Sequence, residues 1–143
     1  MFAGVLATVR AKFTPVATAA ARATPVVKGV VEVGQAFNRA MRTGVADPDP
    51  YDGIAFGQVD LWAYDNYHAS AFGYYLEALM LFGSVTGKDP LSLGSRETAA
   101  VELGFSPLQT TALQQVAHDQ LADAPPTCPA PTVSAPAESA PGR

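Results

Sequence analysis

The sequence predicts a mainly α-helical protein, a small set of helices around one long apolar central helix at about residues 57–85. Apolar side chains recur at helical spacing in several segments. No run alternates between apolar and polar residues, and no Asn-Gly or Asp-Gly turn stands between two apolar strands. The 143 residues, 48% of them hydrophobic, suffice for one modest domain with a packed core. We therefore expect a basic arm at 1–31, a helical domain at 32–124 and a disordered Pro-rich tail at 125–143.

Charged residues make up only 15% of the chain, against about 25% in typical soluble domains, which indicates a surface partly covered by a partner or by lipid. The charges are also divided unevenly. Residues 1–42 hold six Lys and Arg and one acid, a balance of +5, and the rest of the chain holds three Lys and Arg and twelve acids, a balance of −9. Because an acidic body repels phosphates, we expect no nucleic-acid partner. Cys128 is the single cysteine, which excludes an intrachain disulfide and a thiolate metal cluster.

The first 31 residues contain no acid, few Arg and Lys, and many Ala, Thr and Val. That composition is typical of an organellar transit peptide, and it favours a mitochondrial over a chloroplast location. The alternative is an amphipathic segment that stays in the mature protein and binds a membrane surface or a partner. Pro15 and Pro25 would divide it into short helices at about 2–13 and 16–23.

A further helix is predicted from Pro25, in a first-turn position, to Gly44. One apolar face of this helix is formed by Val26, Val30, Val33, Phe37 and Met41. The stretch "VADPDPYDG" that follows is predicted to be a loop, because alternating Asp and Pro prevent regular structure.

The central segment is almost long enough to cross a membrane. The stretch from Ala69 to Gly83 covers fifteen residues, about 22 Å of helix, and is interrupted only by Ser70 and Glu77. A span needs about 20 apolar residues, and a central acid would have to be covered by neighbours. Trp62 at one end would fit an interfacial aromatic belt. A single membrane span is therefore one interpretation of this segment.

The second interpretation is a buried helix of a small bundle. One face carries Phe72, Tyr75, Leu76, Leu79 and Phe82, and the opposite side carries Tyr74, Ala78 and Leu81. A helix that is apolar nearly all round is normally buried on all sides. A chain of this length has little material to surround it, so we expect something outside the chain to cover part of it.

The third interpretation is a polar site at Asp65 and His68. Residues three apart share a helix face, and such a pair could orient an imidazole for base catalysis or provide two metal ligands. The alternative is an acid near a helix N-terminus and a histidine with only local hydrogen bonds. We assign no catalytic residue, metal ligand or cofactor from the sequence.

Residues 95–122 predict a helical hairpin, with a first helix ended by Gly104 and a second begun by Ser106 as N-cap, Pro107 in the first turn and Gln109 in a capping box. This stretch resembles the helix-turn-helix pattern of DNA-binding regulators at Ala100, Gly104, Phe105 and Leu113. The resemblance implies groove binding by the second helix. That helix contains no Lys or Arg, so we expect a plain hairpin.

These features together predict a non-enzymatic accessory or structural subunit of a larger, membrane-associated organellar complex, in character like the small subunits of respiratory or photosynthetic complexes. Its partners would be other subunits and membrane lipid. The alternatives are a soluble helical module that binds a small ligand or a protein, and a virion-type structural protein. The expected contact residues are Trp62, Tyr67, Phe72, Tyr75, Glu77, Leu79 and Phe82.

Overall fold

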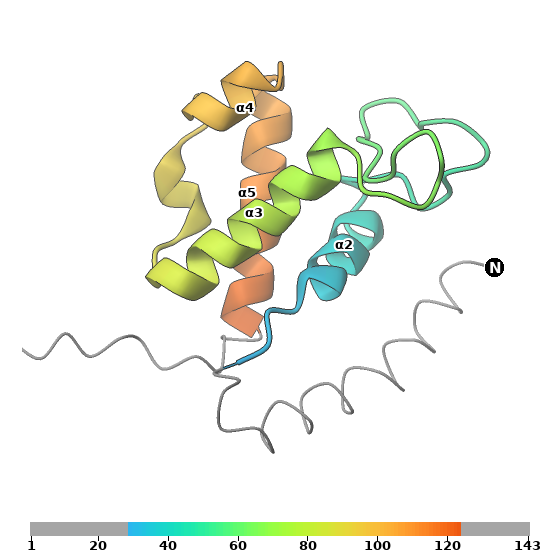
Figure 1. Ribbon diagram of the computed structural model, residues 1–143. Helices are drawn as coiled ribbons and strands as arrows, with labels where there is room; N and C mark the ends of the chain where they lie inside the picture. Colours follow the sequence, from blue (N-terminus) through green and yellow to red (C-terminus); the bar gives the residue numbers. More distant parts are fainter. Residues whose placement is uncertain (1–28, 124–143) are drawn as a thin grey trace, which may run out of the picture.

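The computed structural model describes residues 29–123 (Figure 1). Four α-helices and one 3₁₀ helix follow one another there: α2 (Val33–Arg42), α3 (Ala71–Thr86), η1 (Pro90–Leu93), α4 (Thr98–Glu102) and α5 (Pro107–Asp123). This part of the chain forms two isolated β-bridges but no strand, so the mainly α-helical prediction is confirmed. The short helices predicted at 2–13 and 16–23, most of the basic arm at 1–31 and the Pro-rich tail at 125–143 lie outside the described residues.

The core lies where α3 crosses α5 and α2 rests against both (Figure 1). Glycine and alanine let the backbones approach closely. A Cβ added to Gly73 would overlap the carbonyl oxygen of Leu61, and Ala36 and Ala40 are the buried residues of α2. The larger buried apolar side chains are Leu61, Leu76, Leu79, Met80, Leu113 and Val116.

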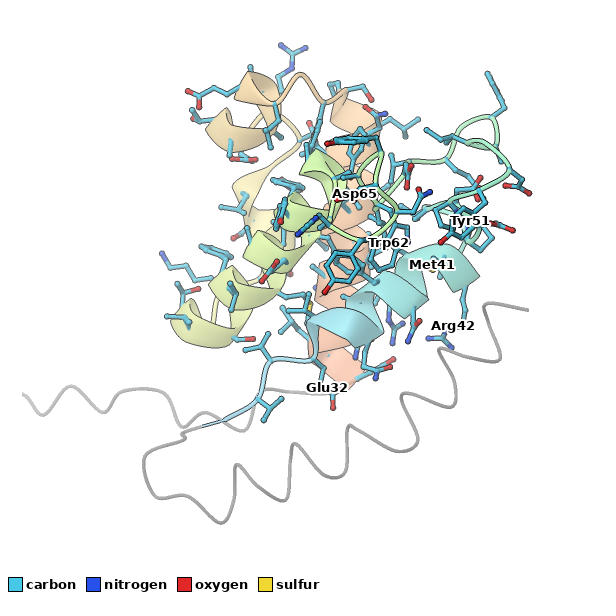
Figure 2. All side chains as sticks on the ribbon, turned by 45° about the vertical axis from the view of Figure 1, so that its right-hand side comes forward. Glu32, Met41, Arg42, Tyr51, Trp62 and Asp65 are labelled. Atoms are coloured by element: carbon cyan, nitrogen blue, oxygen red, sulfur yellow. The ribbon has the colours of Figure 1, made fainter. Side chains whose placement is uncertain are left out.

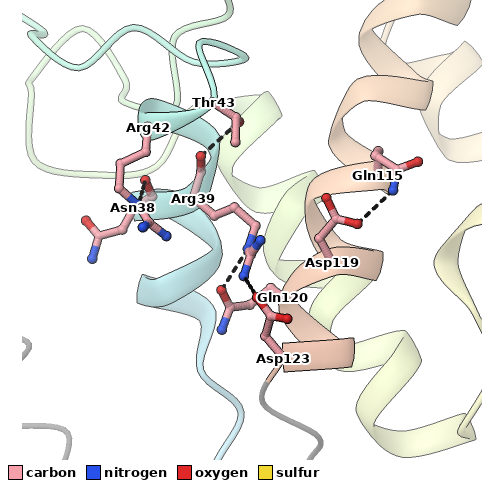
Figure 3. A network of polar contacts seen from close by, with 8 residues as sticks. All are labelled: Asn38, Arg39, Arg42, Thr43, Gln115, Asp119, Gln120 and Asp123. Atoms are coloured by element: carbon pink, nitrogen blue, oxygen red, sulfur yellow. Dashed lines mark hydrogen bonds and ion pairs between the residues drawn. The ribbon is translucent and has the colours of Figure 1, made fainter.

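Arg39 ties α2 to the last turn of α5 (Figure 3). Its Nε donates a hydrogen bond to Gln120 Oε1 at 3.1 Å, and its guanidinium forms an ion pair with Asp123.

The structure begins α2 at Val33, later than the predicted start at Pro25, and residues 29–32 are not helical. Glycine and β-branched valine are weak helix formers, which explains why this stretch does not extend the helix.

The central helix is shorter than predicted, because the structure begins α3 at Ala71 and residues 57–70 form a loop. Ser70 is the N-cap: its Oγ accepts hydrogen bonds from the amides of Phe72 at 3.1 Å and Gly73 at 3.3 Å. The same hydroxyl donates to the carbonyl oxygen of Asp60 at 2.5 Å. Short polar side chains that bind nearby backbone groups compete with helix formation, and here they stop the helix from extending towards residue 57.

The central segment does not form the membrane span considered above. Among the helices of residues 29–123, none has both the length and the apolar character that crossing a bilayer requires.

The predicted hairpin is formed by α4 and α5. Its capping box is present: Ser106 Oγ accepts from the amide of Gln109 at 3.3 Å, and Gln109 Oε1 accepts from the amide of Ser106 at 2.9 Å. Phe105, in the turn between the two helices, stacks on Phe72 with the ring centroids 4.2 Å apart and meets Tyr75 edge-on. These aromatic contacts join the hairpin to α3.

Candidate functional site

Asp65 and His68 lie together in the loop that precedes α3. Trp62 and Ala69 form an antiparallel bridge that closes this loop, and the amide of Ala63 donates to the carbonyl of His68 at 2.7 Å. Asn66, at the tip, has a φ of 54°, a left-handed conformation that asparagine tolerates well. Figure 2 shows Asp65 and Trp62 in this loop. The sequence predicts that Asp65 and His68 share a helix face, but the structure brings them together in a turn.

The Asp65 carboxylate is held at both oxygens. Its Oδ2 lies 2.6 Å from His68 Nδ1, and its Oδ1 accepts hydrogen bonds from the amides of Tyr67 at 3.1 Å and His68 at 3.0 Å. The pKa of this carboxyl is lowered from 3.8 to about 2, first by the hydrogen bond from the His68 ring, then by the His68 and Tyr67 amides. Asp65 is therefore ionised at neutral pH and accepts a proton-bearing Nδ1.

The other side of the His68 ring is open. An imidazole that donates from Nδ1 to a carboxylate keeps Nε2 as its acceptor in the neutral form. The Tyr67 ring meets the His68 ring edge-on, with centroids 5.0 Å apart, which restricts its rotation. The His68 side chain is 63% exposed, so a further group can reach Nε2. The arrangement is that of an oriented general base.

Around this pair, the side chains of residues 29–123 provide neither a metal site nor a nucleophile. Residues 29–123 contain no group of three or more His, Cys, Asp or Glu placed to hold a metal ion. The aliphatic hydroxyl nearest in sequence, that of Ser70, is already committed to capping α3 and to the Asp60 carbonyl.

A second His–Asp pair, formed by His118 and Asp89, has a different setting. His118 Nδ1 of α5 lies 3.0 Å from Oδ1 of Asp89, which also accepts from the amide of Leu91 at 2.9 Å as the N-cap of η1. The Leu91 amide is the main cause of the lowered pKa of Asp89, and His118 contributes less. A shallow cleft of about 300 Å³ lies beside the pair. The pair links α5 to the segment after α3, and nothing in the sequence around Asp89 signals it.

The predicted contact residues divide into core and surface. Tyr75 and Leu79 are only 5% and 2% exposed, so they pack inside the domain. Phe72 packs on Phe105, and Trp62 meets Phe37 edge-on at 5.9 Å. Tyr67 is exposed, and Glu77 and Phe82 are partly exposed. For these last three residues, contact with another subunit stays a prediction.

The side of α3 that faces away from α5 carries a regular row of exposed apolar residues. Tyr74, Leu81 and Val85 are 55%, 44% and 72% exposed, and Ala78 between them is exposed as well. Their spacing of four, three and four places them in one row along the helix. We call these four residues the α3 outer face. The apolar pattern indicates three of them from the sequence, and Val85 completes the row.

Comparison with protein-family models, with curated proteins and with solved structures found no match for this chain.

Proposed function

We propose that Asp65 and His68 act as the acid–base pair of a hydrolytic, acyl-transfer site whose hydroxyl nucleophile is supplied by a bound partner polypeptide. The observation that carries the proposal is the 2.6 Å contact between His68 Nδ1 and Asp65 Oδ2, in a turn that also fixes the other carboxylate oxygen with two amides. In hydrolases that use a Ser-His-Asp triad, the acid likewise holds Nδ1 and leaves Nε2 for the nucleophile.

The chemistry follows from this placement. His68 Nε2 would accept the proton of the attacking hydroxyl as that oxygen forms its bond to the carbonyl carbon. The imidazolium produced would be stabilised by the ionised Asp65 and would then give its proton to the leaving group as the carbon–oxygen bond to that group breaks. Water would next attack the acyl carbon and give a proton to Nε2, and the bond from that carbon to the nucleophile would break as the nucleophile's oxygen takes this proton back. The low pKa of Asp65 keeps its carboxyl ionised, so it orients the ring without taking the proton itself.

A spectroscopic experiment tests the orientation of the base. In a ¹⁵N long-range correlation spectrum at alkaline pH, the neutral His68 ring should carry its proton on Nδ1. Asp65→Asn should change the tautomer populations. A wild-type His68 ring protonated on Nε2 would contradict the proposal, because Nε2 would then be unable to accept a proton.

An activity experiment tests the reaction. The full chain, isolated natively with the polypeptides bound to it, should hydrolyse p-nitrophenyl acetate, and a fluorophosphonate probe should label the nucleophile. His68→Ala should lower turnover by about 10²- to 10⁴-fold and abolish the labelling. His118→Ala is the matched control, since it removes the other histidine of a His–Asp pair, and should leave both unchanged. Equal turnover in the two variants would overturn the proposal, because the reaction would then not depend on His68.

The second candidate function is the accessory subunit predicted from the sequence, and the exposed α3 outer face favours it. A row of apolar side chains on a 16-residue helix is the kind of surface that an assembly covers. The membrane association and the organellar location remain predictions. Alkaline extraction of membranes followed by native gel migration tests them. A chain released as a free species near its own mass of 14.9 kDa would exclude the assembly.

A further inference from the structure

The α3 outer face has the geometry of one half of a helix pair. Tyr74, Ala78, Leu81 and Val85 fall at 4-3-4 spacing, which places them within about 60° around the helix axis. The same helix turns Leu76, Leu79 and Met80 inward, so its orientation in the domain is fixed. The 16 residues of α3 extend over about 24 Å. A 3–4 spacing of apolar residues is the pattern that interlocks with a second helix.

The single charged side chain on α3 is an acid. No Lys or Arg occurs between Arg42 and Lys88, whereas six acids do, and one of them, Glu77, lies on α3 beside the apolar row. None of the ion pairs within residues 29–123 involves Glu77, which is only partly exposed. The whole described part holds four Lys and Arg against twelve acids. A partner for this face should therefore bring positive charge to the edge of an apolar stripe.

We propose that the α3 outer face binds an amphipathic helix of another protein, with apolar residues at 3–4 spacing and Lys or Arg along its edges. The inference rests on the second candidate function, the assembly component, and names the chemistry of its partner. A second copy of this chain fits poorly, because each α3 carries one acid, Glu77, and no cation that could pair with it across the contact. An anionic lipid surface would be repelled by the same acids.

The test uses two synthetic peptides. Each is a labelled helical peptide of about four turns with Leu at 4-3-4 spacing, and the flanking positions hold Lys in one peptide and Glu in the other. Fluorescence anisotropy with the full chain should show binding of the Lys peptide at least about tenfold tighter than that of the Glu peptide. Glu77→Lys should reduce or reverse this preference. Equal affinity for both peptides, or binding of neither, would overturn the proposal.

Matched variants locate the binding. The double variant Leu81→Asn, Val85→Asn should lose binding of the Lys peptide by at least about tenfold. Leu108→Asn is the control, because Leu108 is an apolar residue of α5 that is 80% exposed and lies outside the α3 outer face. All of these positions are exposed, so circular dichroism should show an unchanged fold. Equal binding by the double variant and the control would contradict the assignment. A dimer that the double variant dissociates would assign the face to a second copy and equally overturn it.

The outcomes separate this inference from the proposed functions. Ester hydrolysis and fluorophosphonate labelling test His68 and do not use the synthetic helical peptides. Migration of the native chain in a large complex tests whether an assembly exists. A large complex that the Leu81→Asn, Val85→Asn variant still enters would keep the assembly and reject the α3 outer face as its docking surface.

Discussion

His68 Nδ1 lies 2.6 Å from Asp65 Oδ2, in a turn whose own amides bind the other oxygen of the same carboxylate. Three hydrogen bonds from two residues thus converge on one acid outside any helix. The turn fixes the carboxylate, and the carboxylate fixes the imidazole. The orientation of His68 is therefore determined within four residues, and only the position of the turn depends on the helical core.

The first prediction concerns acid stability. The folded pKa of Asp65 is about 2, below its ordinary value of 3.8, so its ionised form favours the fold. That contribution is complete above about pH 4 and is lost as the pH falls through 2. Asp65→Asn should therefore make the free energy of unfolding less dependent on pH in this window. Urea unfolding at pH 6 and at pH 2.5 measures it, and an equal loss in both proteins would contradict the assignment.

The second prediction concerns the N-cap of α3. Ser70→Ala removes the acceptor for two amides and the donor to the Asp60 carbonyl, and should lower the free energy of unfolding by about 1–2 kcal/mol. Ser70→Thr keeps a hydroxyl at the cap and should retain most of the stability. Urea denaturation of the three proteins decides the point. If the Ala variant is as stable as the wild type, the capping account is wrong.

The same cap explains how far the sequence could predict the fold. The apolar pattern from Phe72 onward is sufficient to predict α3, and Ser106, Pro107 and Gln109 are sufficient to predict the start of α5. The apolar pattern does not predict where α3 starts. It takes no account of short polar side chains that bind backbone amides and so compete with the helix. Ser70 and the acids before it bind nearby backbone groups, so the fourteen positions from 57 to 70 are not helical although the sequence predicts a helix there.

The candidate site was predictable in part. A spacing of three brings Asp65 and His68 close in a helix or in a turn, so their proximity follows from the sequence alone. The double amide contact to Asp65 belongs to the turn and could not be derived from helical geometry. The pair of Asp89 and His118 is separated by 29 positions, and no local pattern predicts a contact that depends on how α5 packs beside η1.

The third prediction concerns the close approach at Gly73. A Cβ there would overlap the backbone oxygen of Leu61 and crowd Ala69 and Phe37, so Gly73→Ala should destabilise the fold by about 1–3 kcal/mol. Gly34→Ala is the control, because α2 leaves open space around Gly34. That change should stabilise the protein by up to about 1 kcal/mol, since alanine is the better helix former. Thermal unfolding of both variants should show opposite signs, and a shared sign would contradict the packing described.

The fourth prediction concerns alkaline stability. Tyr75 is buried against Phe105, and its hydroxyl accepts a hydrogen bond from Gln114 Nε2 at 3.3 Å. Burial raises the pKa of Tyr75 to about 12 from its ordinary value of 10.0. Because the folded pKa is the higher one, the contribution of Tyr75 to stability is complete below pH 10 and is lost as the pH rises through 12. Tyr75→Phe cannot ionise and keeps the ring packing, and Gln114 Nε2 retains its bond to the carbonyl of Gly94 at 2.9 Å. The variant should therefore lose less stability than the wild type between pH 10 and 12 in urea unfolding, whereas parallel curves would mean that Tyr75 is no more difficult to ionise in the folded chain than in the unfolded one.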